Sequence, residues 1–110
     1  MSADIIFVIR NASLQGSTVK SLRNELRGLV APGRKLTLHM SGVESVDTQG
    51  AGVILEIARK LREMGGSVRL VGLQGKVVAF FELLRMHRNI EIYGSHSEAF
   101  ALAGSMTAAA

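Results

Sequence analysis

Hydrophobic residues along the chain change their spacing several times, and each spacing predicts a different element. The segment from Ile5 to Ile9 is continuously apolar, which is typical of a strand covered on both faces. From Ser17 onward, apolar residues recur at helical spacing, which predicts a helix that ends at Ala31-Pro32-Gly33. Residues 36–40 alternate apolar and polar positions like a short strand, and residues 41–47 predict a loop after it.

The second half of the chain repeats this alternation of strand and helix. A helical pattern from about Gln49 to Met64 ends at Gly65-Gly66, where glycine suits a left-handed C-cap. A strand is predicted from Val68 to Leu73, a third helix begins at Gly75, and a short strand is predicted from Ile90 to Tyr93.

The last predicted element is a short helix near the C-terminus. Ser95-His96-Ser97-Glu98 has the form of a capping box and precedes apolar positions from Ala99 to Ala103. We expect one domain over residues 1–104 and a frayed tail over residues 105–110. The alternation predicts an α/β domain with a mostly parallel sheet of four to five strands and about four helices packed on it. The helix positions expected to be buried are Val53, Ile57, Leu61, Val77, Phe80, Phe81 and Leu84.

The composition favours a single cytoplasmic domain. The chain has 110 residues, of which 47% are hydrophobic, and it has no cysteine. The first residues lack the basic region of a signal peptide, and no apolar run approaches the roughly 20 residues of a membrane span. We therefore expect no export and no insertion into a membrane.

The net charge of +4 raises the question of a nucleic-acid partner. The basic residues recur at helical spacing, as solvated polar faces do, and the few aromatic residues form no stacking platform. We therefore expect no nucleic-acid partner, whereas an acidic protein or an anionic membrane surface stays open. The helical basic residues are Lys20, Arg23, Arg27, Arg59, Lys60 and Arg62.

Catalytic and metal-binding motifs are weak, so we expect no catalysis, no cofactor and no bound metal. Gly50-Ala51-Gly52 opens a helix, but Leu55 stands where a dinucleotide fingerprint needs glycine. The three histidines lie far apart without a metal-ligand spacing. A Ser-His-Asp triad can be assembled only on paper, from Ser45, His39 and Asp47. A small nucleotide-binding or enzymatic α/β domain is the remote alternative.

The loop after the second strand is the first place to look for function, because functional groups in open α/β sheets gather at the carboxyl ends of strands. Asp47 is a candidate N-cap for the following helix. Thr48 would then lie in the first turn, near free backbone N–H groups that tolerate a phosphate. From residue type and position alone, a simple role in starting the helix is the preferred interpretation for Thr48.

The segment from Leu36 to Leu73 resembles the core of the STAS family. That core has a strand, a short loop with a small residue and Val, a hydrophobic-Asp-Ser/Thr-x-Gly motif, an amphipathic helix, a glycine and another strand. The matching segments are Ser41-Gly42-Val43, Val46-Asp47-Thr48-Gln49-Gly50, Gly65-Gly66 and Val68-Arg69-Leu70-Val71-Gly72. The similarity continues through Val77 to Met86 and the closing Ser97-Glu98-Ala99.

This resemblance implies a bacterial anti-sigma-factor antagonist that regulates transcription by partner switching. In such antagonists the hydroxyl residue after the Asp is phosphorylated by the anti-sigma factor, a serine kinase, and the phosphorylated antagonist releases this kinase. The resemblance makes Thr48 the phosphorylation site. The partner-binding residues that it implies, besides the outer face of the second helix, are Ser13, Leu14, Gln15, Gly16, Glu44, Ser45, Val46, Asp47, Thr48, Gln49 and Gly50.

The chain departs from the antagonist pattern at three places. Matching Leu14 to the antagonist motif Gly-x-Leu-Asp puts Ala12 at the glycine and Gln15 at the acid, and His39 stands where the second strand often carries an acid. Only one strand is predicted before the first helix, where the family usually has two.

The STAS subunit of the bacterial phospholipid-transport ABC system also carries Val-Asp-Thr-x-Gly, so its ATPase subunit is the alternative partner. The oligomeric state stays open.

Overall fold

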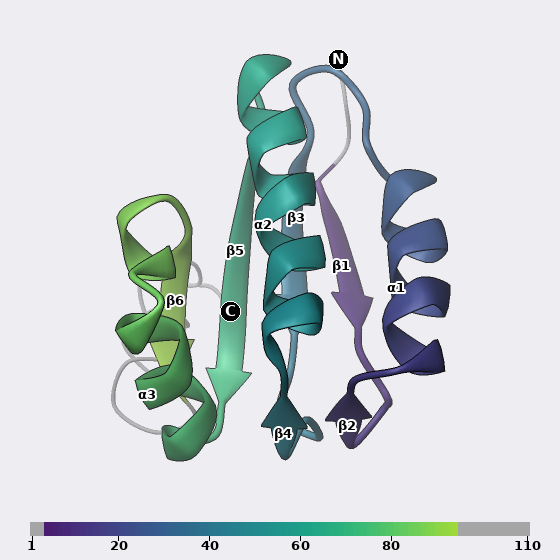
Figure 1. Ribbon diagram of the computed structural model, residues 1–110. Coiled ribbons are helices and arrows are strands. Elements are labelled where there is room, and N and C mark those ends of the chain that lie inside the picture. Colours follow the sequence, from purple (N-terminus) through teal and green to yellow (C-terminus); the bar gives the residue numbers. More distant parts are fainter. Residues whose placement is uncertain (1–3, 95–110) are drawn as a thin grey trace.

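A four-stranded parallel sheet forms the framework of the computed structural model, which describes residues 4–94. Its strands are β1 (Ile5–Val8), β3 (Lys35–His39), β5 (Ser67–Leu73) and β6 (Glu91–Gly94), in the order β1-β3-β5-β6. All neighbouring pairs are parallel, so the strands begin at one edge of the sheet and end at the other (Figure 1). The prediction of an α/β domain with a parallel sheet is confirmed.

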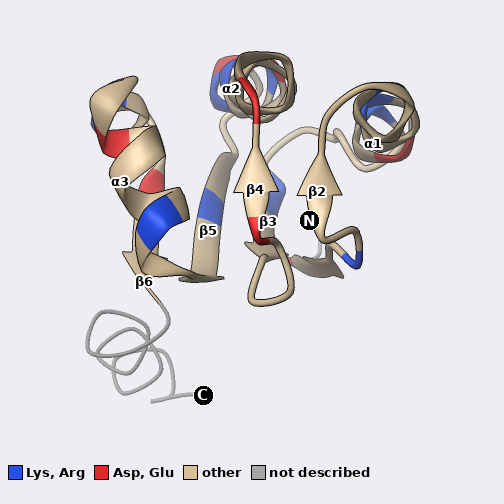
Figure 2. Cartoon of the chain, turned by 60° about the horizontal axis from the view of Figure 1, so that its bottom comes forward, with Lys and Arg blue, Asp and Glu red and all other residues tan. Residues whose placement is uncertain are grey.

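The helices α1 (Ser17–Arg27), α2 (Thr48–Glu63) and α3 (Gly75–Leu83) all cover the same face of this sheet (Figures 1 and 2). Each helix connects a strand to the next strand in the same direction across the sheet, and right-handed crossovers in one direction place their helices on one face. A short 3₁₀ helix, η1 (Met86–Arg88), follows α3. The helix predicted from Ser95 lies outside the described residues.

A second, two-stranded sheet lies at the end of the domain where β3 and β5 finish (Figure 1). Its strands are β2 (Ser13–Leu14) and β4 (Ser45–Val46), which pair in parallel. Sequence analysis missed both, and β4 lies within the predicted loop of residues 41–47, because two residues are too short to show a period. A second strand therefore precedes α1, and the prediction of a single strand there was wrong.

Within residues 4–94, elements of the domain cover only one face of the apolar run Ile5–Ile9, and its alternating exposure shows that the prediction of a strand buried on both faces was wrong. Ile6 is 68% exposed and Val8 is 49% exposed, whereas Ile9 is 2% exposed. The side chains of Ile6 and Val8 point away from the helices, and no described helix covers that face, whereas Ile9 belongs to the core. The one-sided arrangement of the helices is the physical reason.

Most of the helix residues predicted to be buried are buried, with two exceptions near the end of α3. The end of α1 also differs from the prediction. Leu84 is 39% exposed because α3 ends one residue earlier, so its helical phase stops there. Phe80 is only half-buried. Helix α1 ends at Arg27 with Gly28 as its C-cap, before the predicted stop. The positions confirmed as buried are Val53, Ile57, Leu61, Val77 and Phe81.

The end of α2 has the predicted glycine cap. Gly65 adopts a left-handed conformation with φ of 83°, which favours glycine over any residue with a Cβ. Its N–H donates to the Arg62 carbonyl over 3.1 Å, and the Gly66 N–H donates to the Leu61 carbonyl over 2.8 Å. These two bonds form a Schellman motif, which satisfies carbonyls that the helix leaves free.

Candidate functional site

The pairing of β2 with β4 brings together the two segments of the predicted partner-binding surface. The Glu44 N–H donates to the Ala12 carbonyl over 2.7 Å, and the Asp47 N–H donates to the Leu14 carbonyl over 3.2 Å. The Ser45 hydroxyl also donates to the Ser13 hydroxyl over 3.1 Å. Residues 13–16 and 44–50 therefore form one continuous region at the carboxyl edge of the main sheet.

Asp47 caps α2, as the sequence predicts. Its backbone is extended, with φ of −97° and ψ of −179°, and its Oδ1 accepts a hydrogen bond from the Gly50 N–H over 2.8 Å. This bond satisfies one of the amide groups that have no partner within the helix. The carboxylate also lies at the positive end of the helix dipole, which favours its negative charge.

Thr48 is the first residue of α2, and its side chain is exposed. Its hydroxyl makes no hydrogen bond with any residue among 4–94, whereas the neighbouring Asp47 carboxylate is engaged in the cap. The first turn of α2 contains no acidic residue after the cap. A modifying enzyme or a partner can therefore reach the Thr48 hydroxyl without breaking a hydrogen bond of the described domain.

The predicted site residues differ in how much they can contact a partner. Leu14 is fully buried, so its side chain anchors β2 on the core and cannot contact a partner in this conformation. Gly50 is also buried, against β2 and β4. Ser13, Val46 and Asp47 are half-buried. The exposed members are Gln15, Gly16, Glu44, Ser45, Thr48 and Gln49.

Two shallow grooves flank the start of α2, and sequence analysis did not predict them. The first, of about 520 Å³, lies between α1 and α2, and its charged residues are Lys20 and Arg23. The second, of about 210 Å³, lies between β4 and α3, and Glu44, Lys76 and Phe80 contribute to it. The sequence placed the basic pair on a solvated helix face, but only packing shows which helix faces line a groove.

The three residues considered for a catalytic triad each interact with a different group and not with one another. Ser45 bonds to Ser13, Asp47 bonds to the Gly50 amide, and His39 Nδ1 lies 3.4 Å from the Ser41 hydroxyl. Between residues 4 and 94, no group of three or more His, Cys, Asp or Glu side chains is placed to hold a metal ion. No helix in that part of the chain is long and apolar enough to cross a membrane.

Comparison with protein families decides the classification. The STAS domain model matches residues 3–99, which is most of the chain. The chain belongs to the STAS domain family. The Asp47 cap, the exposed Thr48 and the buried Gly50 are thus the structural form of its Asp-Thr-x-Gly segment.

Relatives of this STAS domain include two proteins from Thermotoga. One, from Thermotoga maritima, is named provisionally as an anti-sigma factor antagonist and is 37% identical over 65 residues, which cover 59% of this chain and 58% of the relative. A homologue from Thermotoga neapolitana with a similar name is 34% identical over the same shares. The alignments therefore span less than two thirds of each relative.

A solved structure shares the fold of this STAS domain. The crystal structure of a provisionally named anti-sigma factor antagonist from Thermotoga maritima superimposes with a TM-score of 0.71 and 24% sequence identity. The match covers 88% of this chain and 86% of the other. At this identity the likeness supports the fold and carries no functional detail.

Proposed function

We propose that this STAS domain is a protein-binding regulator of the anti-sigma-factor-antagonist type, with no catalytic activity of its own. Its docking surface consists of residues 13–16, residues 44–50 and the outer face of α2, and its partner is a kinase-type anti-sigma factor. Thr48 is the residue that this kinase phosphorylates. The observation that carries the proposal is the exposed, unbonded Thr48 hydroxyl beside an Asp47 carboxylate that is occupied as a helix cap.

Phosphorylation at this position changes the docking surface and leaves the fold intact. A phosphate adds about 1.5 to 2 negative charges at neutral pH. The amino end of α2 favours that charge through its free amides and dipole, so the helix is not weakened. A partner that packs on the unmodified surface would instead have to bury an unpaired charge, which is costly.

The basic groove beside α2 gives the partner a defined chemistry. Lys20 and Arg23 line it together with Gln49, the residue after Thr48. Arg23 already lies 3.5 Å from Glu56, whereas the side chain of Lys20 has no acidic partner among residues 4–94. Lys20 therefore suits an acidic segment of the partner, and a phosphate on Thr48 would compete with this segment for its positive charge. Phosphorylation would thus weaken the electrostatic attraction between the domain and its partner, in addition to the cost of burying the phosphate charge.

The alternative partner is the ATPase subunit of a phospholipid-transport ABC system. Two features favour it: the hydroxyl residue is Thr rather than Ser, and the exposed Gln15 stands where antagonists carry an acid. The docking surface would be the same, but Thr48 would act as a contact residue without phosphorylation.

Affinity capture from an extract of the source cells tests this proposal, with wild type, Thr48→Ala and Thr48→Glu as bait. We expect wild type and Thr48→Ala to capture a kinase-type anti-sigma factor, and Thr48→Glu to bind it at least about tenfold more weakly. Ser21→Glu is the matched control, because it places the same charge on an exposed hydroxyl residue in the middle of α1.

The same capture separates the possible outcomes. Equal capture by Thr48→Glu and wild type would make Thr48 an ordinary residue at the start of a helix and would refute the switch. Capture of an ABC ATPase in place of a kinase would support the alternative function.

A further inference from the structure

A basic cleft lies at the edge of the sheet opposite Thr48. Lys35, Ser67 and Glu91 line it and are the first residues of β3, β5 and β6, so the cleft marks the amino edge of the parallel sheet. Its volume is about 480 Å³, which is within the range of small-molecule sites. Arg62 in the last turn of α2 lies about 20 Å along the helix from Thr48.

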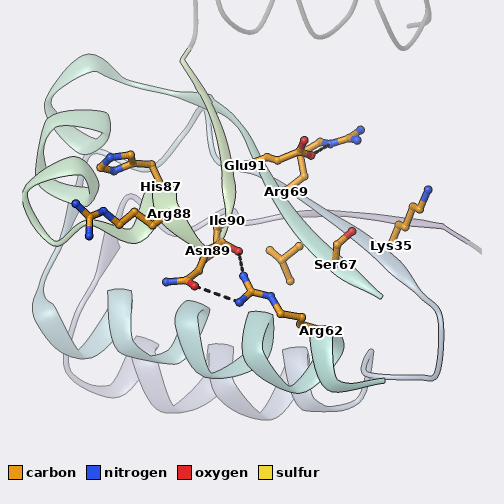
Figure 3. A pocket seen from close by; sticks show the side chains of 10 residues that line it. Lys35, Arg62, Ser67, Arg69, His87, Arg88, Asn89, Ile90 and Glu91 are labelled. Atoms are coloured by element: carbon orange, nitrogen blue, oxygen red, sulfur yellow. Dashed lines mark hydrogen bonds and ion pairs between the residues drawn. The ribbon is translucent and has the colours of Figure 1, made fainter. Parts of the chain in front are cut away.

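Positive charge dominates this cleft. Figure 3 shows side chains from α2, η1 and the three strands around it. Glu91 is the one carboxylate among the lining residues, and it pairs with Arg69 over 3.1 Å. The positively charged lining residues are Lys35, Arg62, Arg69 and Arg88, and His87 contributes an imidazole ring. Apart from the Arg69–Glu91 pair, the lining thus has cationic groups and no acid to neutralise them.

The guanidinium of Arg62 is held in place before any ligand arrives. It donates to Asn89 Oδ1 over 3.1 Å and to the Asn89 carbonyl over 2.6 Å (Figure 3). Arginine has five N–H donors, so these two bonds leave others for a ligand. A fixed guanidinium loses little conformational freedom on binding, which favours recognition of a planar or tetrahedral oxyanion.

Two further cations of the cleft are available to a ligand. Within residues 4–94, the side chains of Lys35 and Arg88 have no hydrogen-bond or ion-pair partner. The loop that carries Arg88 is held by Met86, which is 3% exposed, and Arg85 before it adopts a left-handed φ of 60°. Non-glycine residues keep such a conformation only where the surrounding structure fixes it, so the basic loop has a defined shape.

We propose that this cleft binds a phosphate-bearing small molecule. Arginine forks match the geometry of phosphate oxygens, and a lysine adds a mobile point charge. Polar and charged side chains make up most of the lining, with Val68 and Ile90 as its apolar members, which suits a small polar anion. The site lies at the other end of α2 from the docking surface, so its occupancy does not depend on the function proposed for Thr48.

Titration of the ¹⁵N-labelled chain of 110 residues with sodium pyrophosphate tests the site, with sodium chloride at equal ionic strength as the reference. We expect saturable shifts of the amides of Lys35, Ser67 and residues 88–91. Lys35→Ala with Arg88→Ala should weaken binding by at least about tenfold, without loss of a described contact. Arg59→Ala is the control for a lost surface charge, because it removes one positive charge from the exposed face of α2 and does not line the cleft.

Arg62 and Thr48 variants refine the test. Arg62→Lys keeps the positive charge but removes the planar guanidinium with its several N–H donors. It should therefore weaken pyrophosphate binding by more than Arg59→Ala does. Thr48→Glu should bind pyrophosphate like wild type, even where it no longer binds a protein partner. The experiments can therefore refute the proposed phosphate site without refuting the proposed docking surface, and the reverse.

Vesicles distinguish a soluble phosphate from a lipid headgroup. We compare co-sedimentation of the protein with vesicles of phosphatidylcholine alone and with vesicles of phosphatidylcholine mixed with phosphatidylglycerol. Pyrophosphate shifts without sedimentation identify a soluble phosphorylated molecule, and sedimentation that needs phosphatidylglycerol and both Lys35 and Arg88 identifies a headgroup phosphate. Absence of both signals, or an equal loss in Arg59→Ala, would overturn the proposal.

Discussion

Gly50 lies so close to Leu14 that no other residue fits there without a shift. A Cβ atom at Gly50 would be 2.7 Å from the Leu14 carbonyl oxygen and 3.1 Å from both Leu14 Cβ and Val46 Cγ1. The first turn of α2 therefore packs directly on the β2–β4 sheet. This contact fixes Thr48, two residues earlier, against the segment of residues 13–16.

Alanine substitutions at two glycines of α2 should have opposite effects. Gly50→Ala should lower the free energy of unfolding by about 1 to 3 kcal/mol, because the backbone of Leu14 must move. Gly52→Ala should raise it by up to about 1 kcal/mol, since alanine favours the helix and a Cβ at Gly52 meets nothing within 4 Å. Urea unfolding of both variants measures the difference, and equal values would contradict the close packing of α2 on β2.

Substitutions of Asp47 and Thr48 should have different effects on the stability of the domain. Asp47→Ala should cost about 0.5 to 2 kcal/mol of stability, because the Gly50 amide loses its acceptor. Thr48→Glu should leave the melting temperature nearly unchanged or raise it, since an acid in the first turn contributes about 0.3 to 1 kcal/mol. Thermal unfolding checks both variants. A Thr48→Glu protein that is as unstable as Asp47→Ala would mean that the hydroxyl supports the fold.

Glu56 joins α1 to α2, and we expect this contact to make stability depend on pH. Its Oε2 lies 3.0 Å from Arg27 Nη2, and its Oε1 lies 3.5 Å from Arg23 Nε. The hydrogen bond from Arg27 lowers the pKa of Glu56 below its ordinary value of 4.5, the charges of Arg27 and Arg23 add to this effect, and partial desolvation opposes it. The folded state thus holds this proton more weakly than the unfolded state, so the stabilisation is fully present above pH 4.5 and is lost as the pH falls through the lowered pKa.

An NMR titration of the Glu56 carboxyl checks this prediction. Arg27→Ala should raise the pKa of Glu56 toward 4.5, because it removes the largest cause of the shift. Arg59→Ala should leave this pKa unchanged, because Arg59 is on the same helix as Glu56 but, among residues 4–94, makes no hydrogen bond or ion pair with its carboxylate. A pKa that responds equally to both variants would point to the overall charge of the domain in place of the specific pair.

Features that depend on neighbouring residues could be predicted from the sequence. The Asp47 cap, the Gly65 turn and the apolar phase of α2 each involve residues within one or two helical turns. The alternation of strand and helix likewise predicted the parallel sheet, because crossover connections have a preferred hand. The position of Thr48 in the first turn of α2 followed from the cap.

Features that depend on distant contacts could not be predicted. The β2–β4 sheet joins Ser13 to Ser45 across 32 positions of sequence, through strands too short to show a period. The apolar run of β1 could not reveal that one face is open, since a continuous apolar segment is the same whether a helix covers one side or both. The cleft around Arg62 also needs the packing of α2 against η1, which no local pattern contains.

The open face of β1 gives a direct test of the one-sided architecture. Ile9 is 2% exposed and its N–H donates to the His39 carbonyl over 3.0 Å, whereas Ile6 on the same apolar run is 68% exposed. Ile9→Ala should lower the free energy of unfolding by about 2 to 5 kcal/mol, because it leaves a cavity in the core. Ile6→Ala removes the same atoms from a solvated face and should change it by less than about 0.5 kcal/mol. Urea unfolding at neutral pH compares the two, and a loss at Ile6 as large as at Ile9 would show that this face of the sheet is covered in solution.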